Sequence, residues 1–393
     1  METRCVSWRN SRQVNGMSLT LEEGRYDRQE LISWWDQDRL RSSRLLVVGA
    51  GALGNEVVKD FALVGVGSIH VVDMDVIERS NLARCLFFGE SDNGKFKAEV
   101  VAAGAGRLNP DCHVTFDIAN IMHFGVGFVS NFDLVVGALD NREARLWVNQ
   151  ACRKMGMTWI DGAIEGIRGV VKVFPPAGAC YECTLGERDR EILAKRRSCS
   201  LLSTEEILSG KVPTTATSSA LVASLEAQEA IRLLHGEPSP IANAGWVFTG
   251  ETFDSYVVNY TEDEFCLAHD QYEDVIDVEY TDALNISDLV TDASSRLGTI
   301  VDAIDLEAEI IRSSSCATCG WSHHLNRRLD QLQRDEATCP TCGEIGTFDS
   351  ALALAPTDEL VEIGLRSLGI PSSDVISIRS GGQRVHYRLR GTP

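Results

Sequence analysis

Apolar residues in the first half of the chain alternate between short continuous runs and helical spacings. The run at residues 44–48 (RLLVV) predicts a buried strand, and apolar residues from Val57 to Val64 then recur at the spacing of one helix face. A second short apolar run, at 68–72, predicts another strand. A strand, a helix and a strand in this order predict an α/β fold with a doubly wound, Rossmann-like and mostly parallel sheet.

The same alternation continues to about residue 260. It predicts strands at 113–118, 133–137, 158–161 and 168–174, helices at 97–108 and 142–155, and then a helix at 218–235 and strands at 246–249 and 255–260. Residues 184–212, which lie between these groups, are polar and charged and predict a loop.

The pattern changes beyond about residue 270. Acidic, linker-like residues are followed by helical spacings near 284–312, a cysteine-rich stretch at 316–342, and a strand pattern at 373–390 in which apolar and basic residues alternate. We therefore predict a boundary near residue 275, between an α/β domain at 21–275 and an α+β C-terminal domain at 276–393. Residues 1–20 are predicted to be a disordered extension.

Composition narrows the classes of function. The net charge of −20 argues against a nucleic-acid partner, because phosphate binding needs clustered Lys and Arg. We expect no membrane segment, since no apolar run is long enough to span a bilayer. The first sixteen residues are charged and lack the apolar centre of a signal peptide. Without a secretion signal, the Cys-x-x-Cys pairs are interpreted as metal or redox sites, and a cytoplasmic location is expected.

The first predicted strand runs directly into a Gly-x-Gly-x-x-Gly loop, formed by Gly49, Gly51 and Gly54. Such a loop sets backbone N–H groups and a helix N-terminus against phosphates. Asp73, at the end of the second strand, suits a contact to a ribose hydroxyl. On these features alone an NAD-dependent oxidoreductase is the first hypothesis, because dinucleotide enzymes use the same loop.

The residues after Asp73 favour a triphosphate instead. Asn81, Arg84 and Lys97 place an amide and two cations just beyond the ribose position, and we count Asp75 with them as a nucleotide-site residue. These groups have no role in binding a nicotinamide, but they can neutralise the charge of a departing pyrophosphate.

Asp140 follows the strand predicted at 133–137, at the end of the sheet where open α/β proteins bind ligands. A carboxylate at that position can hold Mg²⁺ against phosphates. The alternative interpretation is that Arg84 and Lys97 are surface charges and that Asp140 caps the next helix.

From Arg25 to Asn141 the chain resembles the ThiF/MoeB/HesA family, the adenylating fold shared with ubiquitin-activating enzymes, and the likeness extends to about residue 270. The resemblance implies an enzyme that uses ATP and Mg²⁺. It implies that the three glycines cradle the phosphates, that Asp73 holds the ribose, that Asn81, Arg84 and Lys97 contact the polyphosphate, and that Asp140 binds magnesium.

Two positions extend this comparison. In the family, the arginine matching Arg28 reaches the phosphates of the partner subunit, so the resemblance implies a homodimer with shared sites. Cys85 directly follows Arg84, where the family usually has Gln, and an amide contact to the nucleotide is therefore missing.

Cys199 is the predicted nucleophile that receives the acyl group. It lies in a polar crossover region (184–217), and three cations precede it in the run AKRRSCS, which favours the reactive thiolate. A thiolate can attack an acyl-adenylate and conserve the activation as a thioester. Family members that form thioesters or persulfides carry a cysteine at a similar point. The alternative interpretation is an inert surface thiol.

Two Cys-x-x-Cys pairs have the spacing of a Cys₄ zinc ribbon at 316–342, and their members are Cys316, Cys319, Cys339 and Cys342. Four thiolates complete a tetrahedron, so this zinc is predicted to be structural.

A third pair, Cys180 and Cys183, needs two further ligands to bind zinc. Family members supply them from a later Cys-x-x-Cys, and this chain has Cys266 and His269 at that place, which implies a Cys₃His site. The alternatives are an empty remnant of a site or a redox pair.

These features lead to one principal hypothesis: ATP-dependent activation of the C-terminal glycine carboxylate of a ubiquitin-like protein, thioester transfer to Cys199, and hand-over to a conjugating enzyme. The alternatives are a sulfur-carrier adenylyltransferase that forms no conjugating thioester, the NAD-dependent oxidoreductase, and a scaffold that has lost activity.

The C-terminal domain is expected to recruit the small protein or the conjugating enzyme through a basic edge strand that carries Arg379, Arg384, Arg388 and Arg390. An appended module of this kind is similar to the activating enzymes of bacterial ubiquitin-like operons used in phage defence. The alternative is a domain that only shields a core face or stabilises a dimer.

Overall fold

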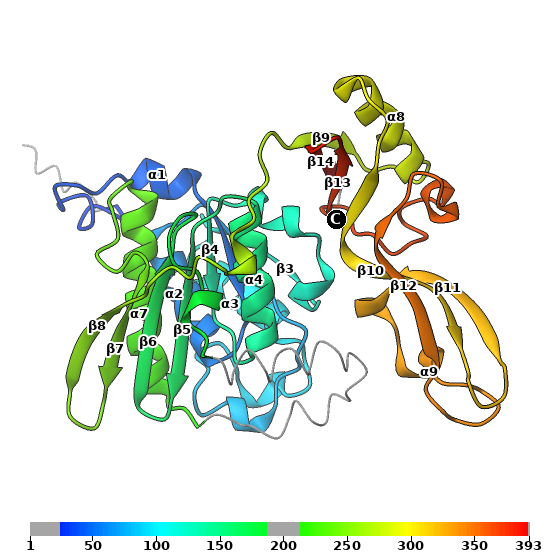
Figure 1. Cartoon of the computed structure of the whole chain (residues 1–393). Coiled ribbons are helices and arrows are strands. Elements are labelled where there is room, and N and C mark those ends of the chain that lie inside the picture. The colour runs from blue at the N-terminus through cyan, green and yellow to red at the C-terminus, as the bar shows by residue number, and fades with distance from the viewer. Residues whose placement is uncertain (1–23, 187–212, 392–393) are drawn as a thin grey trace, which may run out of the picture.

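The computed structural model describes residues 24–186 and 213–391, which form two β-sheets with their own helices (Figure 1). The elements that build the first sheet and its helices are α1 (Gln37–Ser42), β1 (Arg44–Val48), α2 (Ala52–Val64), β2 (Ser68–Val72), α3 (Lys97–Leu108), β3 (His113–Asp117), β4 (Leu134–Gly137), α4 (Arg142–Lys154), β5 (Trp159–Glu165), β6 (Arg168–Phe174), α7 (Ala216–Leu234), β7 (Ala244–Thr249) and β8 (Asp254–Asn259).

The elements of the C-terminal part are β9 (Ile276–Glu279), α8 (Ile286–Leu297), β10 (Ala303–Ser315), β11 (Ser322–Arg328), α9 (Arg334–Ala337), β12 (Thr347–Leu354), β13 (Val375–Ser380) and β14 (Gln383–Arg390). In the described part of the chain, no helix combines the length and the apolar character needed to cross a bilayer.

The larger sheet has eight strands in the order β3-β2-β1-β4-β5-β6-β7-β8. The first five in this order pair in parallel, and β6, β7 and β8 join as antiparallel strands. The predicted doubly wound and mostly parallel sheet is therefore confirmed. Because the chain builds outward from β1 to β3 and then returns to β4, the switch point lies between β1 and β4, where open α/β sheets bind ligands.

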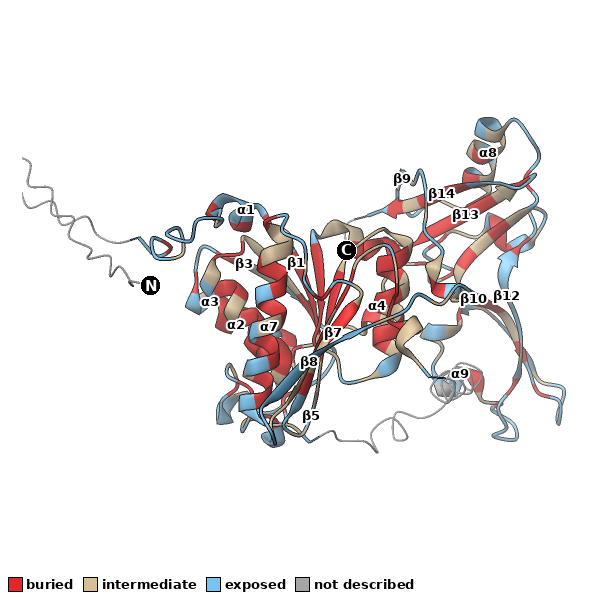
Figure 2. Ribbon diagram, turned by 60° about the vertical axis from the view of Figure 1, so that its left-hand side comes forward, coloured by how far each residue is buried: buried red, intermediate tan, exposed pale blue. Residues whose placement is uncertain are grey.

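Helices cover both faces of this sheet. Figure 2 shows α2, α3 and α7 on one face and α4 on the other, with buried residues along the strands between them. One core cluster joins β1 to α2, α3 and α7, and it includes Phe61, Val101 and Ala227. A second cluster joins the opposite face of the strands to α4, and it includes Val135 and Cys152. The near-continuous apolar runs of the sequence follow from this burial on two faces.

Helix boundaries follow from local chemistry. α2 ends at Gly65, whose φ of 84° is left-handed, and a Cβ there would meet the Tyr26 ring, so glycine is required on both counts. α4 begins where the Asn141 side-chain oxygen accepts a hydrogen bond from the backbone N–H of Ala144 at 2.8 Å. α7 is capped in the same way by Thr215.

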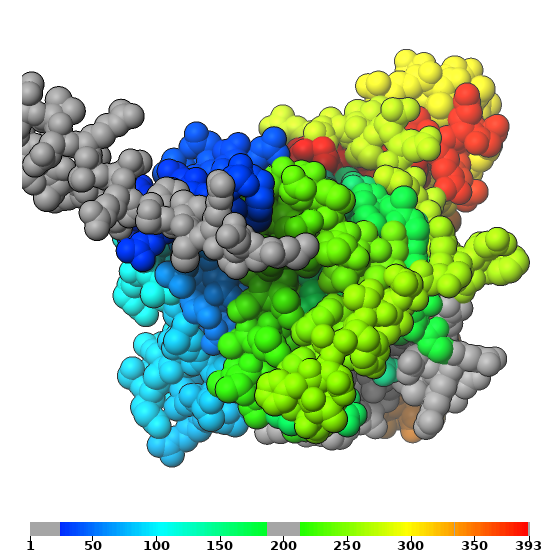
Figure 3. Space-filling model, turned by 90° about the vertical axis from the view of Figure 1, so that its left-hand side faces the viewer, coloured from blue at the N-terminus to red at the C-terminus, as the bar shows by residue number. Residues whose placement is uncertain are grey.

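β8 forms one edge of the larger sheet, and all of its residues are exposed. Figure 3 shows this segment, in light green, running across the surface of the molecule. Tyr256 and Val257 are among the large apolar side chains that β8 leaves in solvent.

The second sheet has six strands. Five follow the order β11-β10-β13-β14-β9, and β12 pairs with β10. The helix predicted near 284–312 is only partly correct, because α8 ends at Gly298, where φ is 65°, and β10 follows. Within β10 the neighbours Ile310 and Ile311 are both buried, and the register of the strand shifts on either side of this pair. Two adjacent apolar residues break the alternation of a regular strand and resemble a helical spacing.

The strand predicted at 373–390 is in fact a hairpin of β13 and β14. Gly381 and Gly382 form its turn, both with positive φ, as a two-residue hairpin loop requires. β14 lies between β13 and β9, so the prediction of an edge strand is wrong. Its basic face is also neutralised: Asp277 on β9 pairs with Arg388 at 2.6 Å and with Arg390 at 3.1 Å.

Polar contacts join the two parts of the molecule. The Asp374 carboxylate, before β13, accepts hydrogen bonds from the backbone N–H of Val126 at 3.3 Å and from the Arg328 guanidinium at 3.0 Å. Glu307 on β10 accepts from Lys154 of α4 at 2.5 Å and from the Tyr272 hydroxyl. Burial raises the pKa of Asp374 to about 7, although Arg328 opposes this shift.

The raised pKa of Asp374 predicts a pH dependence of stability. An unfolded carboxyl ionises near pH 3.9, so between that pH and about 7 the folded chain holds a proton that the unfolded chain releases. Stability from this group is complete below that window and is lost as the pH rises through it, by up to about 1.4 kcal/mol for each pH unit. The Asp374→Asn variant lacks this titration. We subtract the melting temperature of the variant from that of wild type and expect this difference to become smaller from pH 5 to pH 7. A difference that stays constant over this range would contradict the raised pKa of Asp374.

Candidate active site

Two of the three glycines in the loop between β1 and α2 leave no room for a side chain. Gly49 has φ of 103°, and a Cβ there would collide with the Ala138 carbonyl. A Cβ on Gly54 would collide with the Gly49 carbonyl in turn. A Cβ on Gly51, by contrast, would meet no atom within 4 Å. Gly51 is the N-cap of α2 and supplies no side-chain cap, so the first N–H groups of the helix face open space suited to a phosphate.

Asp73 is anchored at the end of β2. One carboxylate oxygen accepts from the backbone N–H of Ala50 at 2.7 Å, and the other accepts from the backbone N–H of Asp75 at 2.7 Å. Burial raises the pKa of Asp73, and Lys97 opposes the shift. The carboxylate is thereby fixed beside the glycine loop, where the predicted ribose contact requires it.

Lys97, the first residue of α3, points into a group of carboxylates. Its ammonium lies 2.7 Å from Asp75 Oδ2. Burial alone would lower the pKa of Lys97, but Asp73, Asp75 and Asp140 together raise it. The structure thus gathers Lys97 with three acidic residues that the sequence analysis had assigned to the same site.

Asn81 and Arg84 are held by their own turn. The Asn81 side-chain oxygen accepts from the backbone N–H of Glu78 at 2.9 Å, so the residue caps this turn and only its amide NH₂ remains for a ligand. Arg84 donates to the Ser80 carbonyl at 3.1 Å. Cys85 is buried, and burial raises its pKa to about 11, which keeps it a neutral thiol and a poor nucleophile.

Asp140 lies at the carboxyl end of β4 and is exposed. Asn141, and not Asp140, is the N-cap of α4. The alternative interpretation of Asp140 as a helix cap is therefore wrong, and its carboxylate faces the solvent at the switch point.

One predicted site residue, Arg28, does not join this group. Arg28 precedes α1, and its neighbour Tyr26 contacts Gly65 and Asn109 at the far ends of α2 and α3. This end of the sheet is opposite to the glycine loop, so within one chain Arg28 does not reach the site. Cys199 and most of the crossover region lie outside the described residues.

Two residues for which no role was predicted also hold the site together. Asn55 donates from its side chain to the carbonyls of Ala50 and Gly51, each at 2.9 Å, and accepts from the backbone N–H of Phe87. Arg145 on α4 donates to the Leu139 carbonyl, next to Asp140. The role of Asn55 could have been predicted, because Asn55 directly follows the last glycine of the loop. The local sequence around Arg145 gives no comparable indication.

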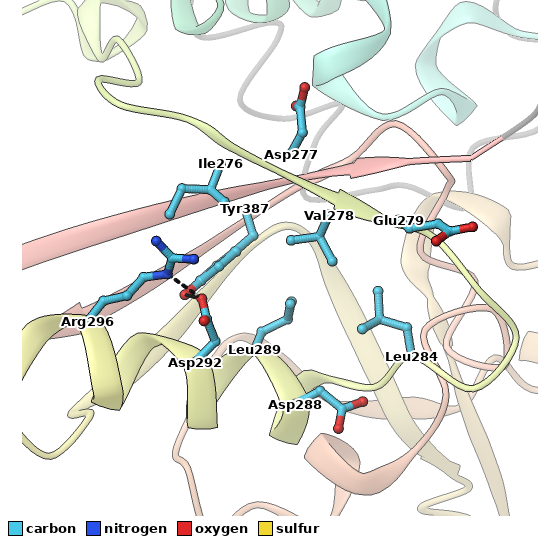
Figure 4. A pocket seen from close by; sticks show the side chains of 10 residues that line it. All are labelled: Ile276, Asp277, Val278, Glu279, Leu284, Asp288, Leu289, Asp292, Arg296 and Tyr387. Atoms are coloured by element: carbon cyan, nitrogen blue, oxygen red, sulfur yellow. Dashed lines mark hydrogen bonds and ion pairs between the residues drawn. The ribbon is translucent and has the colours of Figure 1, made fainter.

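Two pockets of the described chain lie away from this group. One, of about 390 Å³, opens between β9 and α8, where Ile276, Val278 and Leu289 line it beside Asp292 and Arg296 (Figure 4). The other, of about 330 Å³, lies between the two sheets and is lined by residues such as His123 and Arg388. Neither contains a residue of the glycine loop.

The first metal-ligand cluster brings together Cys180, Cys183, Cys266 and His269, whose ligand atoms all lie within 4.8 Å of one another. His269 Nε2 is 3.2 Å from the Cys183 sulfur, while its Nδ1 is 3.2 Å from a Glu262 oxygen. A carboxylate on the second nitrogen is the usual support of a metal-bound histidine. Four converging ligands permit zinc and disfavour an isolated redox pair.

The second cluster holds the four cysteines of the predicted ribbon, Cys316, Cys319, Cys339 and Cys342. Their sulfur atoms are 3.3–3.6 Å apart. Gly320 and Gly343, each directly after a Cys-x-x-Cys pair, have positive φ and make the tight turns behind the ligands. This cluster also permits zinc, with no open position for catalysis.

A glycine loop at the switch point of a doubly wound sheet, with fixed acidic and basic residues around it, defines a nucleotide-binding α/β protein. The model of the ThiF family matches residues 11–267, more than half of the sequence, and the chain belongs to this family.

Two curated relatives are E1-type activating enzymes. The chain is 40% identical over 156 residues to the Nedd8-activating enzyme E1 catalytic subunit of Drosophila melanogaster, covering 36% of this chain and 35% of that protein. It is 40% identical over 178 residues to the SAMP-activating enzyme E1 of Haloferax volcanii, covering 44% of this chain and 66% of that protein. The matched parts are thus one third to just under two thirds of these relatives.

Solved structures agree with the fold. Crystal structures of E. coli MccB with ATP and of MccB in complex with N-formylated MccA match with TM-scores of 0.52 and 0.53. Both are 24% identical and cover 63% of this chain, and the match spans 74% and 75% of those chains. At this identity the likeness supports the α/β fold alone.

The two clusters predict two zinc ions per chain. Replacing both Cys316 and Cys319 by Ser should remove one, and replacing Cys266 by Ser and His269 by Ala should remove the other, because each pair supplies half of one tetrahedron. Elemental analysis of purified protein measures the ratio. A ratio of one in wild type, unchanged by the Cys266 and His269 substitutions, would contradict the Cys₃His site.

Proposed function

We propose that this protein adenylates the C-terminal glycine carboxylate of a ubiquitin-like protein. The observation that carries the proposal is the meeting of the glycine loop, Asp73, Lys97 and Asp140 at one end of the sheet. The names of its relatives, activating enzymes for Nedd8 and for SAMP, support this substrate class. Membership of the ThiF family favours ATP over the nicotinamide of the alternative hypothesis.

In the proposed reaction, a carboxylate oxygen of the small protein attacks the α-phosphorus of ATP. A phosphorus–oxygen bond forms to the carboxylate, and the bond to the β-phosphate breaks, which gives an acyl-adenylate and pyrophosphate. The N–H groups at the start of α2 would hold the phosphates, and Arg84 and Lys97 would neutralise the charge of the leaving group. Asp140 would hold Mg²⁺, which supplies charge neutralisation on the phosphates.

The excess of acidic side chains at the site is consistent with the proposed binding of ATP together with Mg²⁺. Lys97 is surrounded by Asp73, Asp75 and Asp140, so it is neutralised before any ligand arrives. A nucleotide adds further negative charge, and a divalent cation beside Asp140 would reduce the repulsion. Lys97 can then exchange its bond to Asp75 for a phosphate oxygen.

Later steps are part of the same proposal. Cys199 as thiolate attacks the acyl carbon, a thioester forms, and AMP leaves. The acyl group would then pass to a conjugating enzyme, as a step in phage defence. Arg28 would complete the site of a second chain, which makes the homodimer a requirement for full activity.

Pyrophosphate exchange into ATP tests the adenylation. Wild type with a glycine-ended small protein should exchange, and Lys97→Ala and Asp140→Ala should each lose about 100-fold or more, since each removes a charge that stabilises the transition state. Lys95→Ala is the matched control, because Lys95 is close in sequence but pairs with Asp92 instead. Nicotinamide reduction without exchange would favour the oxidoreductase.

Transfer to Cys199 is tested by gel electrophoresis. We expect an adduct between the two proteins that survives SDS, is cleaved by DTT and is absent in Cys199→Ala, because only a thioester to that sulfur has these properties. Exchange should persist in the variant, since adenylation precedes the transfer. Normal exchange without any adduct in wild type would select the sulfur-carrier adenylyltransferase.

A further inference from the structure

A cluster of charged side chains lies buried beneath the carboxyl end of β4. Arg145 comes from α4, Asp161 from β5, Lys172 from β6 and Glu226 from α7, so four elements meet there. Asp161 and Glu226 are fully buried, at 0% exposure. Buried ions carry a large desolvation cost, and a well-packed apolar replacement of such a cluster is often as stable. Stability alone is therefore a weak reason for these residues, and their geometry offers a better one.

Arg145 acts as a fork between β5 and the turn that carries Asp140. Its Nε donates to Asp161 Oδ1 at 2.7 Å. Its Nη2 donates both to the Leu139 carbonyl, at 2.5 Å, and to the Gly162 carbonyl, at 3.0 Å. The planar guanidinium thus fixes the peptide that directly precedes Asp140.

Asp161 holds this fork in place. Lys172 approaches its second carboxylate oxygen at 3.3 Å, so both oxygens are matched by a cation. The Lys172 ammonium also lies 5.1 Å from the centre of the Tyr181 ring. Asp161 pairs with Gly137 across the parallel strands β4 and β5, which sets the carboxylate beside the strand end that Arg145 must reach.

The same strand end supports the glycine loop. The backbone N–H of Ala138 donates to the Val48 carbonyl at 2.8 Å, and the Ala138 carbonyl faces Gly49 with no space for a Cβ between them. A shift of the β4 terminus would therefore move both Asp140 and the loop that precedes α2.

We propose that Arg145 is a positioning residue for the nucleotide site: by holding the Leu139 carbonyl, it fixes the spacing between Asp140 and the glycine loop. This inference rests on the proposed nucleotide-binding function. Its hydrogen bonds go to Asp161 and to the carbonyls of Leu139 and Gly162, so Arg145 would act through the backbone.

Glu226 of α7 completes this buried cluster on the side of Gly162. Its carboxyl group lies over Gly162, where a Cβ would be 2.5 Å from the carboxyl carbon. Burial raises the pKa of Glu226 well above its ordinary value, and the Asp161 charge adds to this. The Arg145 guanidinium makes its hydrogen bonds to Asp161 and to the Gly162 carbonyl, both on β5.

The test uses Arg145→Lys, which keeps the positive charge beside Asp161 but cannot form the fork to two carbonyls. The matched control is Arg153→Lys, because Arg153 is another buried arginine of α4 and donates to the Gly178 carbonyl at 3.2 Å, away from the β4 turn. Melting temperature and zinc content would confirm that both variants are folded.

Two measurements separate positioning from a general structural role. In pyrophosphate exchange, Arg145→Lys should lower kcat by about 10- to 100-fold and raise the Mg²⁺ concentration for half-maximal rate, because displaced reacting groups have costs of this order. Excess Mg²⁺ should restore part of the rate. Binding of a fluorescent ATP analogue should require more Mg²⁺ in this variant, while Arg153→Lys should stay within about twofold of wild type.

Each outcome decides the proposal. Wild-type kcat and Mg²⁺ dependence in folded Arg145→Lys would overturn it, and so would an equal loss in Arg153→Lys. If wild type binds the ATP analogue but shows no exchange, the adenylation proposal fails while the binding measurement still tests Arg145. If wild type binds no nucleotide with Mg²⁺ present, both proposals are wrong.

Discussion

At the switch point of the larger sheet, Gly49 lies against the carbonyl of Ala138 with no space for a side chain between them. This contact joins the end of β1 to the end of β4, and the candidate site depends on it. It brings the N–H groups at the start of α2 within the same small region as Asp140. Backbone N–H groups and a carboxylate that binds a metal ion can hold the same phosphate chain only when these two strand ends are this close.

Electrostatic balance is the second constraint on this region. Asp73 is tied to backbone N–H groups on both oxygens, so it cannot turn away from Lys97. Behind the site, Arg145 and Lys172 neutralise Asp161 in the interior. The charges that would contact a nucleotide thus lie at the end of the sheet, and the charges that hold the backbone are buried beneath it. This division explains how an acidic protein can present a site for an anionic ligand.

The C-terminal part is joined to the larger sheet mainly by hydrogen bonds and ion pairs, such as those of Asp374 and Glu307. Its arginines on β14 are used for this purpose and for the pairing with Asp277, and they do not form a free basic surface. The cysteine ribbon lies in the turn between β10 and β11 and in the segment between α9 and β12, and its four ligands converge there. A separate role for this part of the chain is consistent with that placement.

The sequence by itself determined the α/β class, the glycine loop and the Cys₄ cluster, because each is encoded by residues close together in the chain. Apolar runs, a three-glycine spacing and Cys-x-x-Cys pairs need no tertiary information. Part of the strand at 303–315 was mistaken for helix because two neighbouring residues, Ile310 and Ile311, are both buried and break the alternation of a strand. Tertiary structure alone decided the bonds of Arg145 to Leu139 and Asp161 and the pairing of Arg388 with Asp277, because these partners meet only through strand register and helix packing, which leave no periodic signal in the sequence.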